Sequence, residues 1–193
     1  MRKKSHISLA KGVINGLDIR DRINHRLSFY IGSIWPDCIP SFITRRHCIE
    51  DTFDIFNKNM EKFVKKFNSN KDMSIRSTWR MGVMLHYIAD YFTFPHNKNY
   101  TGNLKDHCVY EEELKHCMYK YVDNINADKY QNTKIVLSDL NSISDYIKEK
   151  HAQYKLSGSN VEKDCKYSVL ACMCVMASLL NIVSVNKANL AVA

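Results

Sequence analysis

The sequence is poor in the residues that interrupt helices. Of its 193 residues, 6 are glycine and 3 are proline. A fold made of short strands needs turn residues at every reversal of the chain, so this scarcity argues against a turn-rich all-β protein and favours long helices. Internal repeats and low-complexity tracts are also missing. We therefore expect an ordinary helical protein, and its length fits one domain over residues 1–193.

A disulfide framework is missing as well. The chain has 7 cysteines, an odd number, without CxxC spacing, and Cys172 and Cys174 would point to different faces of a helix. These features predict reduced thiols. Lys11, Asn15 and Asp18 interrupt any apolar run after the basic first residues. No signal-peptide core is recognised there, and we expect a cytoplasmic protein.

Positive charge exceeds negative charge in this chain. The formal net charge is +8, which suits an anionic partner such as phosphate, a lipid headgroup or nucleic acid. The lysines are dispersed and form no stripe, so a solvated basic surface explains the charge equally well. Charge alone does not choose between these interpretations.

Apolar residues recur at helical spacing along most of the chain, which predicts an all-α, single-domain multi-helix bundle. Ser5 would cap the first helix, and the segment 74–92 is apolar nearly all round, as in a central buried helix. The segment 167–185 has no charged residue and is long enough to span a bilayer. A buried core helix explains it better, because the other helices need a central partner; a membrane-associated scaffold is the alternative. The expected helices are 5–17, 21–33, 47–67, 74–92, 106–122, 135–150 and 167–185.

The most informative residues are His86 and Asp90 in the segment 74–92. At i and i+4 they share one face of a helix, together with small residues, and point into the protein. A buried carboxylate without a partner is costly. A hydrogen-bonded core pair would explain the two residues, and so would a metal ion, because imidazole and carboxylate are ordinary zinc ligands.

Repetition of this pattern favours the metal. His107 and Glu111 form a second i, i+4 pair on the next expected helix, and His96 lies between the two pairs, directly after Pro95. Five potential ligands therefore fall at the two ends of one helix–loop–helix hairpin. Three further candidates lie upstream: Asp37 between two prolines, His47 at a helix start, and His6 in the first helix. Each of them is uninformative alone.

The order of these histidines and carboxylates along the chain resembles that of the zinc-dependent phospholipase C family and of its relative, the fungal single-strand nuclease. The flanking segments 32–37, 90–97 and 102–107 resemble those of the shorter clostridial-type members, and by motif the resemblance covers about residues 5–120. It implies a helical bundle with two or three Zn²⁺ ions. Asp37, His47, His86 and Asp90 would hold one ion; His96, His107 and Glu111 a second; and His6 a third, with Asp90 as the bridge.

The resemblance also implies a reaction. A metal-activated hydroxide would cleave a phospholipid or a related phosphodiester, with Asp37 as the catalytic carboxylate that accepts a proton. Peripheral contact with a membrane would accompany such a substrate. In the secreted relatives the third zinc is bound by the amine and carbonyl of an N-terminal tryptophan. Here Met1 stands five residues before His6, so we expect the third site to be incomplete or differently built.

Other residues have weaker assignments. Tyr87, Asn97 and Asn103 are candidates for orienting the histidines, and Tyr30, Trp35 and Phe42 for an aromatic cage around a choline-type headgroup. His25, His116 and His151 are not assigned to the site. Two alternative functions remain open: a nucleotide or single-stranded nucleic acid phosphodiesterase on the same metals, for which stacking aromatics would be expected, and a zinc-binding helical protein without catalysis.

Overall fold

The computed structural model describes residues 1–39, 46–67, 73–124 and 135–192, with side chains as far as residue 185. Within these residues the chain forms seven α-helices and two short 3-10 helices, and no strand, which confirms the expected all-α fold. The elements are α1 (Lys3–Gly16), α2 (Arg26–Ile34), η1 (Trp35–Cys38), α4 (Ile49–Lys66), α5 (Ile75–Tyr91), η2 (Phe94–His96), α6 (Leu104–Asp123), α8 (Leu140–Leu156) and α9 (Val161–Val192).

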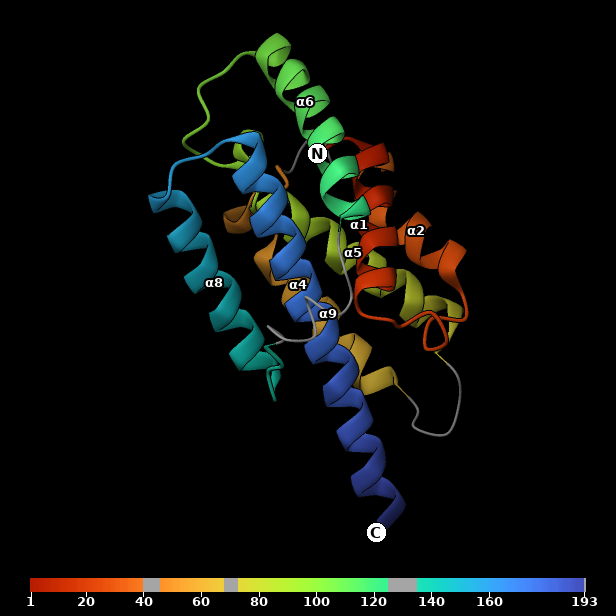
Figure 1. Ribbon diagram of the computed structural model, residues 1–193. Helices are drawn as coiled ribbons and strands as arrows, with labels where there is room; N and C mark the ends of the chain where they lie inside the picture. Colours follow the sequence, from red (N-terminus) through yellow and green to blue (C-terminus); the bar gives the residue numbers. More distant parts are fainter. Residues whose placement is uncertain (40–45, 68–72, 125–134, 193) are drawn as a thin grey trace.

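Helix α5 is the central element, as its apolar pattern predicted. It packs against α2, α4 and α9 (Figure 1), and every residue from Arg80 to Tyr91 is buried. The helix begins after Ser74, whose hydroxyl accepts a hydrogen bond from the Ser77 backbone N–H at 3.2 Å. A polar side chain in the second half of α5 is therefore shielded from solvent, whichever direction it takes.

Two glycines set the contact between α2 and α5. A Cβ atom on Gly32 would lie 2.1 Å from the Trp79 carbonyl oxygen, and one on Gly82 would lie 2.2 Å from the Phe29 carbonyl oxygen. Only residues without a side chain allow the two backbones to approach this closely. The end of α2 therefore lies directly against the face of α5 that carries the polar residues.

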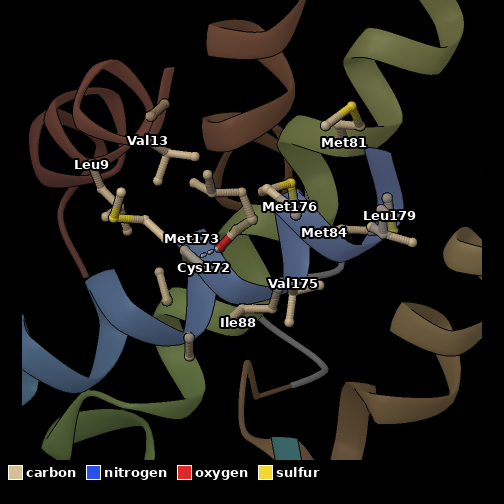
Figure 2. Close-up of a cluster of buried hydrophobic side chains, with 14 of the residues drawn as sticks. Leu9, Val13, Met81, Met84, Ile88, Cys172, Met173, Val175, Met176 and Leu179 are labelled. Atoms are coloured by element: carbon tan, nitrogen blue, oxygen red, sulfur yellow. Dashed lines mark hydrogen bonds between the residues drawn. The ribbon is translucent and has the colours of Figure 1, made fainter. Parts of the chain in front are cut away.

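Helix α9 completes the core, running through the length of the bundle in Figure 1. Figure 2 shows its side chains between those of α1 and α5, and the Cys172 thiol donates to the Leu85 carbonyl at 3.6 Å. Its segment Val161–Val185 has the length and hydropathy of a membrane span, but 78% of the apolar window is buried within the protein. This burial is typical of the core helix of a folded domain, the interpretation that the sequence favoured.

The boundaries of the first two helices differ from those expected. Helix α1 begins at Lys3, and Ser5 is a buried residue within it rather than its cap. The second helix is shorter than predicted and starts at Arg26. The preceding segment forms turns, in which the Arg22 N–H bonds to the Ile19 carbonyl at 3.1 Å.

Capping residues explain where α6 and α8 begin, whereas α4 begins without a side-chain cap and α9 begins at Val161 rather than at 167. Asn103 and Asp106 form a capping box, so α6 begins at Leu104. Asp139 accepts from the Ser142 N–H at 2.9 Å, so α8 begins at Leu140 rather than near 135. Helix α4 begins at Ile49, which leaves His47 in the preceding loop rather than in the helix.

Candidate metal centre

Helix α5 supplies the residues around which the site is built. His86 and Asp90 are fully buried, and His86 Nε2 lies 3.1 Å from Asp90 Oδ2. The His86 ring is oriented from the other side: its Nδ1 donates to the Ser33 carbonyl at 2.9 Å, across the close contact of α2 with α5. Because a carbonyl can only accept, Nδ1 carries the proton. The other ring nitrogen, Nε2, therefore faces the centre of the site, where Asp90 and His47 lie.

Two residues from the segments between α2 and α4 join this pair. His47 Nδ1 lies 2.9 Å from His86 Nε2 and 3.2 Å from Asp90 Oδ2. Asp37, in η1, places its Oδ1 3.4 Å from His47 Nδ1 and 3.7 Å from His86 Nε2. One ligand atom from each of these four residues lies within 4.8 Å of the other three, which is the arrangement of a single ion-binding site.

A second group lies beside the first. It consists of His96 from η2 and the pair His107 and Glu111 from α6. Glu111 Oε1 is 3.2 Å from His107 Nε2 and 3.5 Å from His96 Nε2. These three residues are partly exposed, at 15%, 29% and 14% respectively, and thus lie on the solvent side of the buried first group.

The N-terminal residues approach from α1 and contact both groups. The ring nitrogen Nε2 of His6 lies 3.3 Å from Asp90 Oδ1. The α-amino group of Met1 donates to Asp90 Oδ1 at 2.9 Å and lies 3.0 Å from Glu111 Oε1. From the sequence we expected a third site that is incomplete or differently built. In the structure α1 starts at Lys3, and the Met1 amine lies beside Asp90.

Asp90 connects the parts of the site through its two oxygens. Oδ2 faces His47 and His86, whereas Oδ1 faces His6, the Met1 amine and, at 3.7 Å, His96 Nε2. The structure thus brings together all eight residues predicted from the sequence: His6, Asp37, His47, His86, Asp90, His96, His107 and Glu111.

Comparison with known families agrees with this arrangement. The profile of the family described as zinc dependent phospholipase C matches residues 5–160. The chain belongs to the zinc-dependent phospholipase C family. Searches of curated proteins and of solved structures gave no match. Membership supports a zinc phosphodiesterase at the level of the family and confirms the resemblance found in the sequence.

The donor set of this family member fits zinc. Neither ring nitrogen of His6 has a hydrogen-bond partner in the described part of the protein, although the ring is fully buried. Near the ring, His86 Nε2 faces a carboxylate oxygen of Asp90 and the Nδ1 of a second imidazole, His47. Buried acceptors that face one another are unfavourable unless a cation lies between them. Imidazole nitrogen and carboxylate oxygen are the ligands that zinc prefers in such a place.

The ionisation states of Asp90 and His6 also suit metal binding. Burial opposes ionisation of Asp90, but the electrostatic interactions with His96, the Met1 amine and His86 outweigh it and hold the pKa of Asp90 well below its usual value. Burial, with a smaller effect of His86, lowers the pKa of His6 to about 4. At neutral pH the carboxylate is therefore charged and the imidazole neutral, as metal ligation requires.

The η2 loop that carries His96 is held by buried polar residues outside the ligand set. Asn97 donates to the Thr93 carbonyl at 2.8 Å and accepts from His151 Nε2 at 2.8 Å. Asp164 of α9 accepts from the Phe94 backbone N–H, Tyr110 and Tyr154 at 2.8, 2.8 and 2.7 Å. These bonds tie the loop to α6, α8 and α9.

Several supporting assignments from the sequence change as a result. His151, which the sequence did not assign to the site, is buried, and its Nε2 donates to Asn97. Asn103 caps α6 and makes no contact with a histidine ring among the described hydrogen bonds. Tyr87 packs edge-on against His47 and His86, at ring separations of 5.7 and 5.6 Å, so it does contact the ligands.

Replacing Asp164 by asparagine should change how stability depends on pH. Burial raises the Asp164 pKa from 3.8 to about 6, despite hydrogen bonds that lower it. The folded state thus binds this proton more tightly than the unfolded state, and stability is lost as the pH rises from about 4 to about 6. The loss is about 3 kcal/mol. Asp164→Asn imitates the protonated form and should abolish this loss.

The measurement is the free energy of unfolding by urea at several pH values, for the wild type and for Asp164→Asn. Between pH 4 and pH 7 the stability of the wild type should fall by about 3 kcal/mol relative to that of the variant. Asp145→Asn, an exposed change on α8, serves as the control and should follow the wild type. Parallel curves for the wild type and Asp164→Asn would contradict the prediction.

Proposed function

We propose that this protein is a zinc-dependent phosphodiester hydrolase of the phospholipase C type, with a phospholipid as its substrate. The observation that carries the proposal is the convergence of two ligand groups on Asp90, whose two oxygens face different groups. One isolated zinc site would suit a structural role. Adjacent groups that share a carboxylate are typical of hydrolytic sites in which several ions act on one phosphate.

In this proposal, three sets of residues hold the ions. Asp37, His47, His86 and Asp90 hold the first, and His96, His107 and Glu111 the second. His6, Asp90 and the Met1 amine would hold the third, and the amine would release a proton to the solvent on binding the ion. Ions bound by these residues would supply an acidified water and would neutralise charge on the phosphoryl oxygens.

The residues of the chain have two further roles, which are to hold the ligand atoms in position and to accept a proton. The buried imidazoles hold their ligand atoms in fixed positions, since Ser33 orients His86 and Tyr87 packs against both His47 and His86. Asp37 is the carboxylate suited to accept a proton, because it is 20% exposed and lines the cleft, whereas Asp90 is fully buried. A phosphate entering from solvent would therefore meet Asp37 before Asp90.

The cleft beside these residues has room for a phospholipid headgroup. Its volume is about 860 Å³, and it is lined by Asp37, His47, His96, His107 and Glu111 as well as by the Met1 amine end. The more exposed ligands are therefore accessible to a substrate, while the buried ones support them. A structural zinc site is closed by protein ligands, whereas a catalytic one keeps a position open.

The proposal is tested by metal analysis and a substrate panel. Purified protein supplied with zinc should contain two or three ions per chain, measured by plasma mass spectrometry. It should hydrolyse p-nitrophenyl phosphodiesters and release the phosphorylated headgroup from short-chain phospholipids. Zinc bound at this level without hydrolysis of any phosphodiester would favour a non-catalytic zinc protein, and absence of zinc would contradict the proposed site altogether.

A further inference from the structure

The mouth of the cleft is basic apart from the ligand set. Six cationic side chains line it: Arg2, Lys3, Lys4, Arg46, Lys98 and Lys115. The two carboxylates in the lining, Asp37 and Glu111, both belong to the ligand groups. With zinc bound, those carboxylates would be occupied by the ions, and the other charged side chains in the described lining are all cationic.

Most of this charge has no ion-pair partner among the described residues. Arg2 and Lys115 each form an ion pair with Glu112. Lys3, Lys4, Arg46 and Lys98 are exposed, and in the described part of the chain none of them pairs with a carboxylate. Charges arranged around a concave site attract ligands of the opposite sign and repel those of the same sign.

A cationic headgroup finds no complementary group in the described lining. Recognition of a quaternary ammonium requires an aromatic cage or a free carboxylate. Apart from histidines, Tyr100 is the aromatic residue of that lining. Tyr30 and Trp35, candidates from the sequence, do not line the cleft, and Phe42 lies outside the described residues. The described lining therefore contains no group that would bind choline, and its lysines would repel the positive charge of choline.

An apolar side chain at the same entrance favours a lipid over a nucleic acid. Leu104 lines the cleft and is 79% exposed, and Lys98 and Lys105 are exposed nearby in the sequence. An exposed leucine among lysines suits the surface of an anionic bilayer, where the apolar group enters the interface and the cations bind headgroups. Single-stranded nucleic acid would require a series of stacking aromatics instead.

We propose that this basic mouth selects phospholipids with a net anionic headgroup, such as phosphatidylglycerol, over zwitterionic phosphatidylcholine. This inference rests on the proposed phosphodiesterase activity and names the substrate class of the same site. The phosphodiester is common to both lipids, so the ions act on either; the mouth distinguishes them by the rest of the headgroup, which carries a positive charge in phosphatidylcholine.

Initial rates on monomeric short-chain lipids provide the test, because they separate headgroup selection from recruitment to a surface. The zinc-loaded protein is assayed with dihexanoyl phosphatidylglycerol and dihexanoyl phosphatidylcholine below their micellar concentrations. We expect roughly a tenfold preference in kcat/KM for the anionic lipid. A single-stranded DNA oligonucleotide is assayed in parallel, and faster hydrolysis of it than of either lipid would overturn the inference.

Charge-reversal variants locate the source of the preference. Arg46→Glu with Lys98→Glu should bring the ratio of the two rates close to one, with the zinc content of each preparation measured. Lys62→Glu with Lys65→Glu makes the same change in net charge on the exposed face of α4, away from the cleft, and should keep the preference. Lys3→Glu with Lys4→Glu serves as a second mouth variant in case the first does not fold.

The outcomes separate the two proposals. Hydrolysis of both lipids with equal rates, faster hydrolysis of phosphatidylcholine, or a preference unchanged in both mouth variants would overturn the selectivity and leave the phosphodiesterase standing. Failure of the zinc-loaded protein to hydrolyse any lipid or p-nitrophenyl phosphodiester would overturn both.

Discussion

Asp90→Asn should lose most of its bound zinc and hydrolyse phosphodiesters roughly a thousandfold more slowly than the wild type. The amide has almost the same size as the carboxylate, so packing in the buried site is preserved. It has no charge, and one of its two oxygens is replaced by an NH₂ group that cannot ligate a cation. Because Oδ1 and Oδ2 face different ligand groups, this single change weakens the site on both sides.

Asp90 is a sharper test than any one histidine, because the charged residues around it keep its pKa far below neutrality. The variant therefore removes a charge that is present at every working pH. Zinc per chain and kcat/KM for a p-nitrophenyl phosphodiester are measured together with the circular dichroism spectrum. Asp145→Asn makes the same chemical change on the exposed surface of α8 and should match the wild type. A fully zinc-loaded, fully active Asp90→Asn would exclude a bridging role.

Removal of zinc should lower the melting temperature by roughly 10–20 °C. An ion present at a hundred times its dissociation constant stabilises the folded state by about 2.7 kcal/mol, so two ions contribute about 5 kcal/mol. In a protein of this size each kcal/mol corresponds to about 2–4 °C. The loss is large here because the ions compensate the buried Asp90 carboxylate and the ring nitrogens of His6 that lack hydrogen-bond partners, all of which remain buried without them.

Differential scanning calorimetry before and after dialysis against a chelator measures this effect, and added zinc should restore the original transition. The same treatment of Asp90→Asn should produce a much smaller change, which separates loss of site-bound zinc from a general effect of the chelator. An unchanged transition in wild-type protein that has been shown to be free of metal would mean that the ions contribute nothing to stability.

Most of the ligand geometry was predictable because it is periodic. Spacings of four residues place His86 with Asp90, and His107 with Glu111, on single helix faces. The apolar segment around the first pair also predicted that α5 would be central. Capping side chains such as Asp139 can be recognised in a sequence, but the pattern of apolar residues extended past them, and for that reason the start of α8 was placed too early.

The supporting contacts were not predictable, since they join residues far apart in the chain. The Ser33 carbonyl that orients His86 is a backbone group and leaves no trace in the sequence. Asp164 stands beside an apolar run, where a first-turn carboxylate is ordinarily a solvated group favoured by the helix dipole. Its three donors come from η2, α6 and α8. The place of Met1 depended on the path of residues before α1, for which the sequence contains no signal.

The region by which the family is recognised ends at residue 160, one residue before α9 begins. A polypeptide cut there would keep every proposed ligand, yet it would lose Asp164 and the apolar side chains that fill the space between α1 and α5 in Figure 2. Anyone trimming this chain for expression, or grafting its centre onto another scaffold, should therefore set the limits by the helix that packs behind the histidines rather than by the extent of the recognisable motif.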